Sequence, residues 1–356
     1  MNKYIEMAVP QGKRIPNIKS YGSGLLPHEV QDDHCWINQY GCVAATDKDA
    51  LTVVQIDDCH FGLLPGPEFS PRLYRGQTTF HKKCVPSLFR EPMTQIRYLT
   101  DILKKFEFYK LMSQHPIVHY LQGWRIDGKN FKIDMEGLSA HYEFATPMMD
   151  VTKSKDIAMF FATCKRKDRE DKLYEPTIEE GHEIVLYTVD LKTMLEANHP
   201  DFHVIGFQAL PRPGAQKAYS LFVGYKKNLN ACPFVSHEIL RLNPKESEKY
   251  FEMFEGGATL FPDDPVDNLA REIKQSLEID SEIVEVCFER HWIPKVWENT
   301  SDLKRFLNKF GYVVTEKHLE FSDEIRHKII KNWNSNPPLR DDMVTCRFVS
   351  PSSQNF

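Results

Sequence analysis

The sequence lacks the segments that would direct the chain into a membrane or along a secretory route. None of its apolar runs approaches the roughly 20 residues that cross a bilayer. The first residues, MNKYIEMAVPQGKRIPN, contain no apolar core of a secretory signal. A formal net charge of -5 excludes a generally basic surface for nucleic acid, but not a local basic patch. We therefore expect a cytoplasmic protein with no membrane partner.

Short motifs for nucleotides and metals are missing as well. The chain has no G-x-G-x-x-G and no G-x-x-x-x-G-K-[ST], so neither a Rossmann nor a P-loop fold is predicted. Its 8 cysteines include no C-x-x-C pair, the spacing that structural zinc sites prefer. The one suggestive group is His34-Cys35, Cys42 and Cys59-His60, for which ordinary thiols are the better explanation. We expect reduced cysteines and no metal.

The apolar pattern predicts an α+β protein. Of the 356 residues 41% are hydrophobic, which is ample for a buried core. Because the predicted strands cluster in one part of the chain, a regular βαβ alternation is not favoured. The strands are expected at 183–189, 204–210, 218–223 and 234–242. The helices are expected at 93–112, 155–165, from Asp264-Pro265 onward, at 303–310 before Gly311, and from Ser322 onward.

Local signals refine several of these elements. Ser154 is placed to cap the helix at 155–165, and the small Ala158 and Ala162 would let that helix approach a sheet closely. The helix at 93–112 is expected to turn its lysines to solvent. The run 165–172 (KRKDREDK) is expected to be a solvated loop, and 51–54 a short strand.

Three segments carry side chains suited to binding anions or moving protons. The first is Tyr74-Arg75-Gly76-Gln77, followed by 85–90 (VPSLFR). An Arg can pair with phosphate through two hydrogen bonds, and Gly lets a ligand approach the backbone. The second is 141–152 (HYEFATPMMDVT), and the third is 212–222 (RPGAQKAYSLF). Taken singly, each is also explained by a surface arginine, a turn or a helix cap.

In this order the segments resemble the FRG domain, named for its Phe-Arg-Gly signature. The family elements are F-R-G-Q, P-S-L-F-R, H-Y-G-x-P-T-R-L-L-D-W-T, A-L-F-F-A, R-I-x-x-Q-x-G-x-F and F-P-D. They correspond here to 74–77, 86–90, 141–152, 158–162, 212–222 and 261–263, and the resemblance spans about 70–275. This sequence departs from the pattern at Tyr74, Glu143 (family Gly), Ala145 (Pro), Pro147 (Arg), Val151 (Trp), Lys217 and Ser220.

FRG domains are distantly similar to ADP-ribosyltransferases, and the resemblance implies a split mixed β-sheet with flanking helices. NAD would bind as substrate in the cleft between the two halves of the sheet. The implied catalytic residues are Arg75, Gln216, Asp150 and His141, with Asp150 or His141 activating the acceptor because a Gln is no base. Tyr142 or another aromatic would stack on the nicotinamide. The implied nucleotide contacts are Tyr74, Gly76, Gln77, Arg90, Tyr142, Thr146, Thr152, Ser154 and Arg212.

Alternatives remain open at this stage. The chain could transfer ADP-ribose to a protein, a nucleic acid or a small molecule, or hydrolyse NAD. It could instead be a module that binds a nucleotide or ADP-ribose without chemistry, or a toxin-like effector that uses its C-terminal helices for recognition. The predicted boundaries are an N-terminal extension at 1–69, the core at 70–276, a helical extension at 277–349 and a tail at 350–356. The acceptor macromolecule is not identified.

Overall fold

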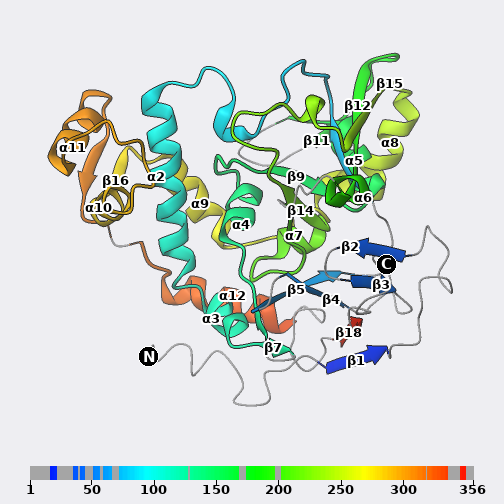
Figure 1. The fold of residues 1–356 in the computed structure, drawn as a ribbon, viewed down its shortest axis with the longest axis horizontal. Helices are drawn as coiled ribbons and strands as arrows, with labels where there is room; N and C mark the ends of the chain where they lie inside the picture. Colours follow the sequence, from blue (N-terminus) through cyan, green and yellow to red (C-terminus); the bar gives the residue numbers. More distant parts are fainter. Residues whose placement is uncertain are drawn as a thin grey trace.

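The structure is a computed structural model that describes most of the chain. The described residues are 17–21, 35–38, 41–44, 51–56, 59–65, 72–126, 129–167, 174–196, 202–317, 319–335 and 345–349. The predicted tail from residue 350 lies outside them. They form an α+β fold, which confirms the predicted class (Figure 1). No helix in these ranges is both long and apolar enough to cross a membrane.

A six-stranded sheet, called the core sheet below, forms the centre of the fold. Its order is β13-β14-β9-β6-β12-β15, and every neighbouring pair is antiparallel. Mixed pairing was expected here and instead occurs in a second sheet. The strands are β13 (Phe202–Val204), β14 (Ala218–Leu221), β9 (Met149–Thr152), β6 (Arg72–Gln77), β12 (Glu183–Asp190) and β15 (Val235–Arg241).

The core sheet is forked between β6 and β9. Strand β12 pairs with β6 over the full length of β6, but β6 and β9 share only the pair Tyr74 and Thr152. Beyond this pair the two strands form no further pairs, and residues 75–77 and 150–151 line an opening between them. The sheet is thus split into two three-stranded halves that meet at a single residue pair.

Helix α5 (Lys155–Thr163) lies directly against β6 beside this fork. The Ser154 hydroxyl accepts a hydrogen bond from Ile157 N–H and caps the helix, as predicted. A Cβ atom at Gly76 would lie 1.7 Å from the carbonyl oxygen of Ala158 and 2.8 Å from the nitrogen of Ala162. The predicted close approach through small residues is therefore confirmed, and it depends on glycine in the strand.

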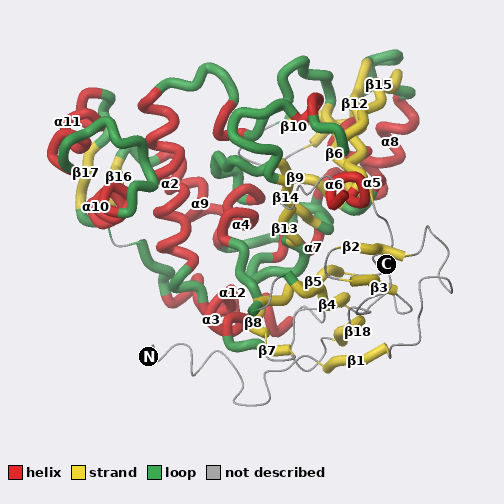
Figure 2. The backbone as a smooth tube through the Cα atoms, in the orientation of Figure 1, coloured by secondary structure: helices red, strands yellow, loops and turns green. Residues whose placement is uncertain are grey.

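The second sheet contains strands from both ends of the chain. Its order is β1-β18-β4-β5-β8-β7, with both parallel and antiparallel pairs. Figure 2 shows its strands below those of the core sheet. They are β1 (Asn17–Tyr21), β18 (Thr345–Val349), β4 (Leu51–Gln55), β5 (His60–Pro65), β8 (Lys129–Phe131) and β7 (Arg125–Ile126). The short pairs are β2 (Cys35–Asn38) with β3 (Gly41–Ala44), β10 (Cys164–Arg166) with β11 (Tyr174–Pro176), and β16 (Glu278–Asp280) with β17 (Val313–Thr315).

Most of the predicted helices are present with the predicted ends. Asp264 accepts from Val266 N–H at the start of α9, and Gly311 follows α11 with a φ of 84°. The remaining α-helices are α2 (Gln95–Met112), α3 (Pro116–Gln122), α4 (Met135–His141), α6 (Leu191–Glu196), α7 (Pro211–Ala215), α8 (Pro244–Met253), α9 (Val266–Gln275), α10 (Ser281–Glu289), α11 (Thr300–Lys309) and α12 (Asp323–Ser335). Figure 1 shows α10, α11 and β16 on the far side of α2 from the core sheet.

Helix α2 does not turn all its lysines to solvent. Lys104 and Lys105 are buried, with 6% and 7% of their surface exposed. The Lys104 ammonium donates to the carbonyl of Ile273 at 2.7 Å, and that of Lys105 pairs with Glu136 at 2.7 Å. The expectation of a lysine-covered outer face is wrong at these positions, because α9 and α4 cover it.

Two other segments differ from prediction. Strand β13 ends at Val204, and 205–210 is irregular and buried, with Phe207 N–H donating to the carbonyl of Leu63 at 2.8 Å. The residues between the expected strands at 204–210 and 218–223 form the short helix α7. Part of the predicted solvated loop is strand β10, which ends at Arg166.

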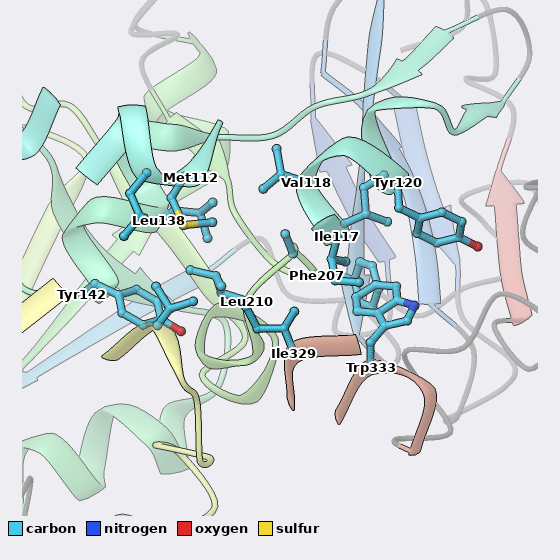
Figure 3. Close-up of a cluster of buried hydrophobic side chains, with 14 of the residues drawn as sticks. Met112, Ile117, Val118, Tyr120, Leu138, Tyr142, Phe207, Leu210, Ile329 and Trp333 are labelled. Atoms are coloured by element: carbon cyan, nitrogen blue, oxygen red, sulfur yellow. The ribbon is translucent and has the colours of Figure 1, made fainter. Parts of the chain in front are cut away.

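The largest apolar cluster joins segments that are far apart in the sequence. Leu63 from β5, Phe207, and Trp333 from α12 belong to it together with side chains of α3 and α4. Figure 3 shows several of these side chains, and the rings of Phe207 and Trp333 are in contact. The cluster therefore packs helices against the second sheet, whereas buried side chains of the core-sheet strands, such as Leu73 and Val185, form a separate cluster.

Replacing Gly76 by alanine should destabilise the protein strongly. The added methyl group would overlap the Ala158 carbonyl, and backbone atoms give way only at high cost. We expect the free energy of unfolding to fall by about 3 kcal/mol or more in chemical denaturation. Gly214→Ala is the matched control, because its Cβ would meet only Gly206 O at 4.0 Å. Equal stability of the two variants would contradict the described packing of α5.

Acid should destabilise the fold through His115, which caps α3. Burial, with nearby His119 and Arg326, lowers the pKa of His115 to about 3 from 6.5. The unfolded chain takes up a proton near pH 6.5 while folded His115 stays neutral, so stability falls as the pH drops through this window. From pH 7 to 5 this contributes a loss of about 2 kcal/mol. His115→Asn keeps a capping side chain and should lose that much less over the same range, whereas exposed His119→Asn should behave as wild type.

Candidate functional site

The three polar segments singled out from the sequence meet at the fork of the core sheet. A cavity of about 430 Å³ opens there. Its wall contains residues of all three segments, on β6, around α4 and β9, and after α7. Of the predicted site residues, those in the wall are Tyr74, Arg75, Gly76, Gln77, Arg90, His141, Asp150, Thr152 and Gln216.

Two arginines form one side of the cavity. The half-buried Arg75 reaches across the fork, and its Nη1 donates to the backbone carbonyl of Asp150 at 2.6 Å. Its Nε is buried and has no hydrogen-bond partner. Neither Arg75 nor Arg90 forms an ion pair with another described residue. Partial burial and then the guanidinium of Arg75 lower the pKa of Arg90, against a smaller opposing effect of Asp150. Two unneutralised cations side by side favour an anionic ligand.

A histidine and a glutamine form a second polar group in the wall. The Gln216 amide nitrogen donates to the carbonyl of Leu260 at 3.1 Å, which turns its Oε1 toward His141. His141 Nδ1 lies 3.0 Å from that oxygen. An amide oxygen only accepts, so Nδ1 carries the proton and Nε2 keeps a free lone pair. Nε2 is buried without a partner. Burial, only partly opposed by Asp150, lowers the pKa of His141, so the ring is neutral at pH 7.

Thr152, Thr146 and Ser154 have bonds that hold the backbone. The Thr152 hydroxyl donates to the carbonyl of Gln216 at 2.8 Å and accepts from Ser154 N–H at 3.1 Å. Thr146 N–H donates to the Ser87 hydroxyl at 3.0 Å, which fastens the 141–152 segment to the 85–90 segment. Thr146 and Ser154 are not part of the cavity wall. Their bonds place the elements that carry Gln216 and Arg90.

Tyr142 and Arg212 lie behind the wall, outside the cavity. Figure 3 shows Tyr142 among the buried apolar side chains, and its hydroxyl donates to Asp264. Burial, followed by the effect of Asp264, raises the pKa of this hydroxyl well above its usual value. The Arg212 guanidinium lies 4.3 Å from the Tyr142 ring centre, pairs with Asp267, and donates to the carbonyl of His141 at 3.0 Å. Arg212 therefore fixes the backbone of His141 through a hydrogen bond made outside the cavity.

Three aromatic side chains that were not predicted as site residues also line the cavity. They are Phe161, Tyr174 and Phe261. The rings of Tyr174 and Phe261 are stacked, with centres 5.5 Å apart and planes at 22°. Phe161 stood on the predicted apolar side of its helix, and Phe261 in the F-P-D element. Tyr174 had no signal in the sequence, because it follows the charged run and reaches the cavity through β11.

Glu143 and Arg166 also enter the wall. Glu143 has a φ of 65°, in the left-handed region that favours glycine, where the resemblance had a Gly. Its carboxylate pairs with Arg166 at 2.6 Å and with Lys274 at 3.3 Å. Burial raises the pKa of Glu143, but these two cations outweigh it and leave the pKa below its ordinary value. The expectation of a solvated loop is wrong for Arg166.

Comparison with known families agrees with the motif order. Residues 70–171 match the family model of the FRG domain. The chain contains an FRG domain. The matched part of the FRG domain holds Arg75, Arg90, His141 and Asp150, whereas Gln216 and Phe261 come from beyond its end and are brought back by the fold. No curated protein and no solved structure matches the chain.

The metal prediction is not tested by this structure. In the described part of the chain, no group of three or more His, Cys, Asp or Glu side chains is placed to hold a metal ion. The side chains of Cys35 and Cys42, which carried the one suggestive group, lie outside that part.

Neutral His141 should carry its proton on Nδ1. Nitrogen NMR of the histidine rings should show this tautomer at pH 6 to 8. Gln216→Leu removes the acceptor, so the Nδ1 proton should no longer be favoured. A charged His141 ring at pH 7 would contradict the lowered pKa, and a neutral ring with its proton on Nε2 would contradict the hydrogen bond to Gln216.

Proposed function

We propose that the cavity binds NAD and cleaves its bond to nicotinamide, passing ADP-ribose to an acceptor or to water. The observation that carries this proposal is the pair Arg75 and Arg90. Two guanidinium groups without an acidic partner among the described residues line a cavity whose wall also contains a cluster of aromatic side chains. A ligand that satisfies both kinds of side chain has a diphosphate and a flat ring. Nucleotides of the NAD type have both.

Charge accounts for the diphosphate half. The buried Arg75 Nε has its donor free, and Arg90 lies beside it at the cavity wall. Charge-assisted bonds from guanidinium to phosphate are about twice as strong as neutral ones. A bound diphosphate would also relieve the repulsion by which Arg75 lowers the pKa of Arg90.

The aromatic wall accounts for the ring. Phe161, Tyr174 and Phe261 form a cluster of edge and stacked contacts into which a planar ring can insert. The resemblance to the FRG domain implied that Tyr142 or another aromatic residue stacks on the nicotinamide ring. We assign this stacking to these three residues, because Tyr142 is engaged with Asp264 behind the wall.

The polar groups account for the chemistry. When the glycosidic C–N bond breaks, its electron pair leaves with nicotinamide, and the ribose carbon becomes electron-poor, as in glycoside cleavage. The Asp150 carboxylate lines the cavity and would stabilise that positive charge. The acceptor's oxygen then bonds to the carbon, and its proton passes to the free lone pair of His141 Nε2.

Gln216 has a different part in this scheme from the ribose contact that the resemblance implied. Both ends of its amide are engaged, one by Leu260 and the other by His141. It sets the histidine tautomer and so keeps Nε2 ready to accept a proton. Gln216 is thus a positioning residue for His141.

Loss of either cavity arginine should weaken binding of NAD. In calorimetric titration, Arg75→Ala and Arg90→Ala should lower the affinity at least about 30-fold, as expected for removal of a charged contact worth about 2 kcal/mol or more. Release of nicotinamide should fall in parallel. Arg290→Ala, an exposed arginine after α10, is the control for loss of charge. Thermal unfolding of each variant separates lost binding from lost folding.

The outcomes also separate the two classes of function. Nicotinamide release by the wild type, lost in the arginine variants, supports an enzyme. Saturable binding of NAD or ADP-ribose without release supports a binding module built on the same site. Unchanged NAD binding and turnover in a folded Arg75→Ala variant would refute the site.

A further inference from the structure

A second hollow leads outward from the site. It measures about 400 Å³ and shares Gln77, His81 and Arg90 with the cavity at the fork. Lys83, Phe89 and Glu91 also line it. The cavity at the fork is therefore continuous with this second hollow through the three shared residues.

Two loops are fastened together along this second hollow. The side-chain amides of Asn228 and Asn230 each donate at 2.9 Å, to the carbonyls of Lys82 and His81 respectively. In return Cys84 N–H donates to the Asn228 side chain at 2.8 Å. The loops at 81–90 and 225–230 are therefore held side by side in a fixed relation.

The surface of these loops is basic. Lys82, Lys83, Lys226 and Lys227 are all exposed, and together with Arg90 and Tyr225 we call them the lysine platform. Within the described ranges only Lys83 of these lysines has an acidic partner. That partner is Glu91, 3.9 Å away and itself 67% exposed, so the pair is weak. Because the whole chain has a net charge of -5, this concentration of cations is local.

An aromatic ring stands among these cations. Tyr225 is 60% exposed, although its ring rests edge-on against Phe89 with centres 4.7 Å apart. Lys226 has a φ of 55° and holds its ammonium 5.3 Å from the Tyr225 ring. Because Tyr225 stays 60% exposed between these two contacts, its ring offers accessible aromatic surface on which a base can stack.

We propose that the lysine platform binds single-stranded nucleic acid and leads it to the cavity. Lysines meet phosphates as point charges, and an exposed aromatic ring meets an unpaired base. A duplex hides the faces of its bases, and an acidic peptide offers none, so the combination favours a single strand. That the strand is also the acceptor of ADP-ribose rests on the proposed function. Binding of the strand does not.

Binding is measured first, without NAD, by fluorescence anisotropy with a labelled oligothymidylate of about 12 nucleotides, within the site sizes of known single-strand binders. We expect saturable binding that weakens with salt. The double variant Lys82→Glu/Lys226→Glu and the single variant Tyr225→Ala should each lower the affinity about tenfold or more. Lys295→Glu/Lys309→Glu changes two exposed lysines in the C-terminal region and should bind as wild type.

Competition then decides between kinds of partner. Unlabelled single strand should compete better than duplex or polyglutamate. Equal competition by polyglutamate, with no effect of Tyr225→Ala, would overturn the proposal in favour of an acidic peptide. Absence of salt-dependent binding, or equal loss in the control variant, would overturn it outright.

A final arm separates this proposal from the proposed function. With NAD labelled in its adenylate part, transfer of label to the strand, lost in the platform variants, supports both. Strand binding without label leaves the platform standing and removes the strand as acceptor. Nicotinamide release by a protein that binds no strand leaves the NAD site standing and removes the platform.

Discussion

Helix α5 and strand β6 touch backbone to backbone at Gly76, where a side chain would overlap the carbonyl of Ala158. Only two residues separate the end of β9 from the start of the helix, so this contact also fixes how β9 approaches β6. The strands meet at one pair, Tyr74 and Thr152, and then separate. The cavity exists because the helix fills one side of the junction and the sheet does not close the other. Arg75 crosses the gap and reaches the Asp150 carbonyl, so one side chain both spans the opening and faces it.

The polar wall depends on a second set of polar groups behind it. Arg212 is 1% exposed, and a buried cation is costly unless it is paired with an anion or hydrogen-bonded, although its Nε has no hydrogen-bond partner among the described residues. Its partners are Asp267, the His141 carbonyl and the face of Tyr142. Thr152 holds the Gln216 backbone in the same way. The histidine and glutamine thus face the cavity with their backbone and amide positions already determined, which lowers the cost of ordering them when a ligand binds.

Local signals in the sequence predicted α5 and β12, whereas the resemblance to the FRG domain implied that three segments meet at one site. The sequence did not show which of two neighbouring residues in a segment faces the cavity. His141 faces the cavity and Tyr142 the core because α4 ends between them, and that end is set by packing against Asp264 and Arg212. Tyr174 and Arg166 arrive through β11 and β10, whose pairing is not visible in a charged run. Burial of Lys104 likewise depends on α9, more than 150 residues later in the chain.

Glu143 has an unfavourable backbone conformation, but its side chain forms favourable ion pairs. Its left-handed φ costs about 1–2 kcal/mol in a residue with a Cβ. Its carboxylate holds Arg166 and Lys274 beside the aromatic wall. A glycine at this position would relax the backbone and release two cations at the edge of the cavity. The three positions therefore depend on one another physically, and we expect relatives of this chain to carry either Glu with the two cations or Gly without them.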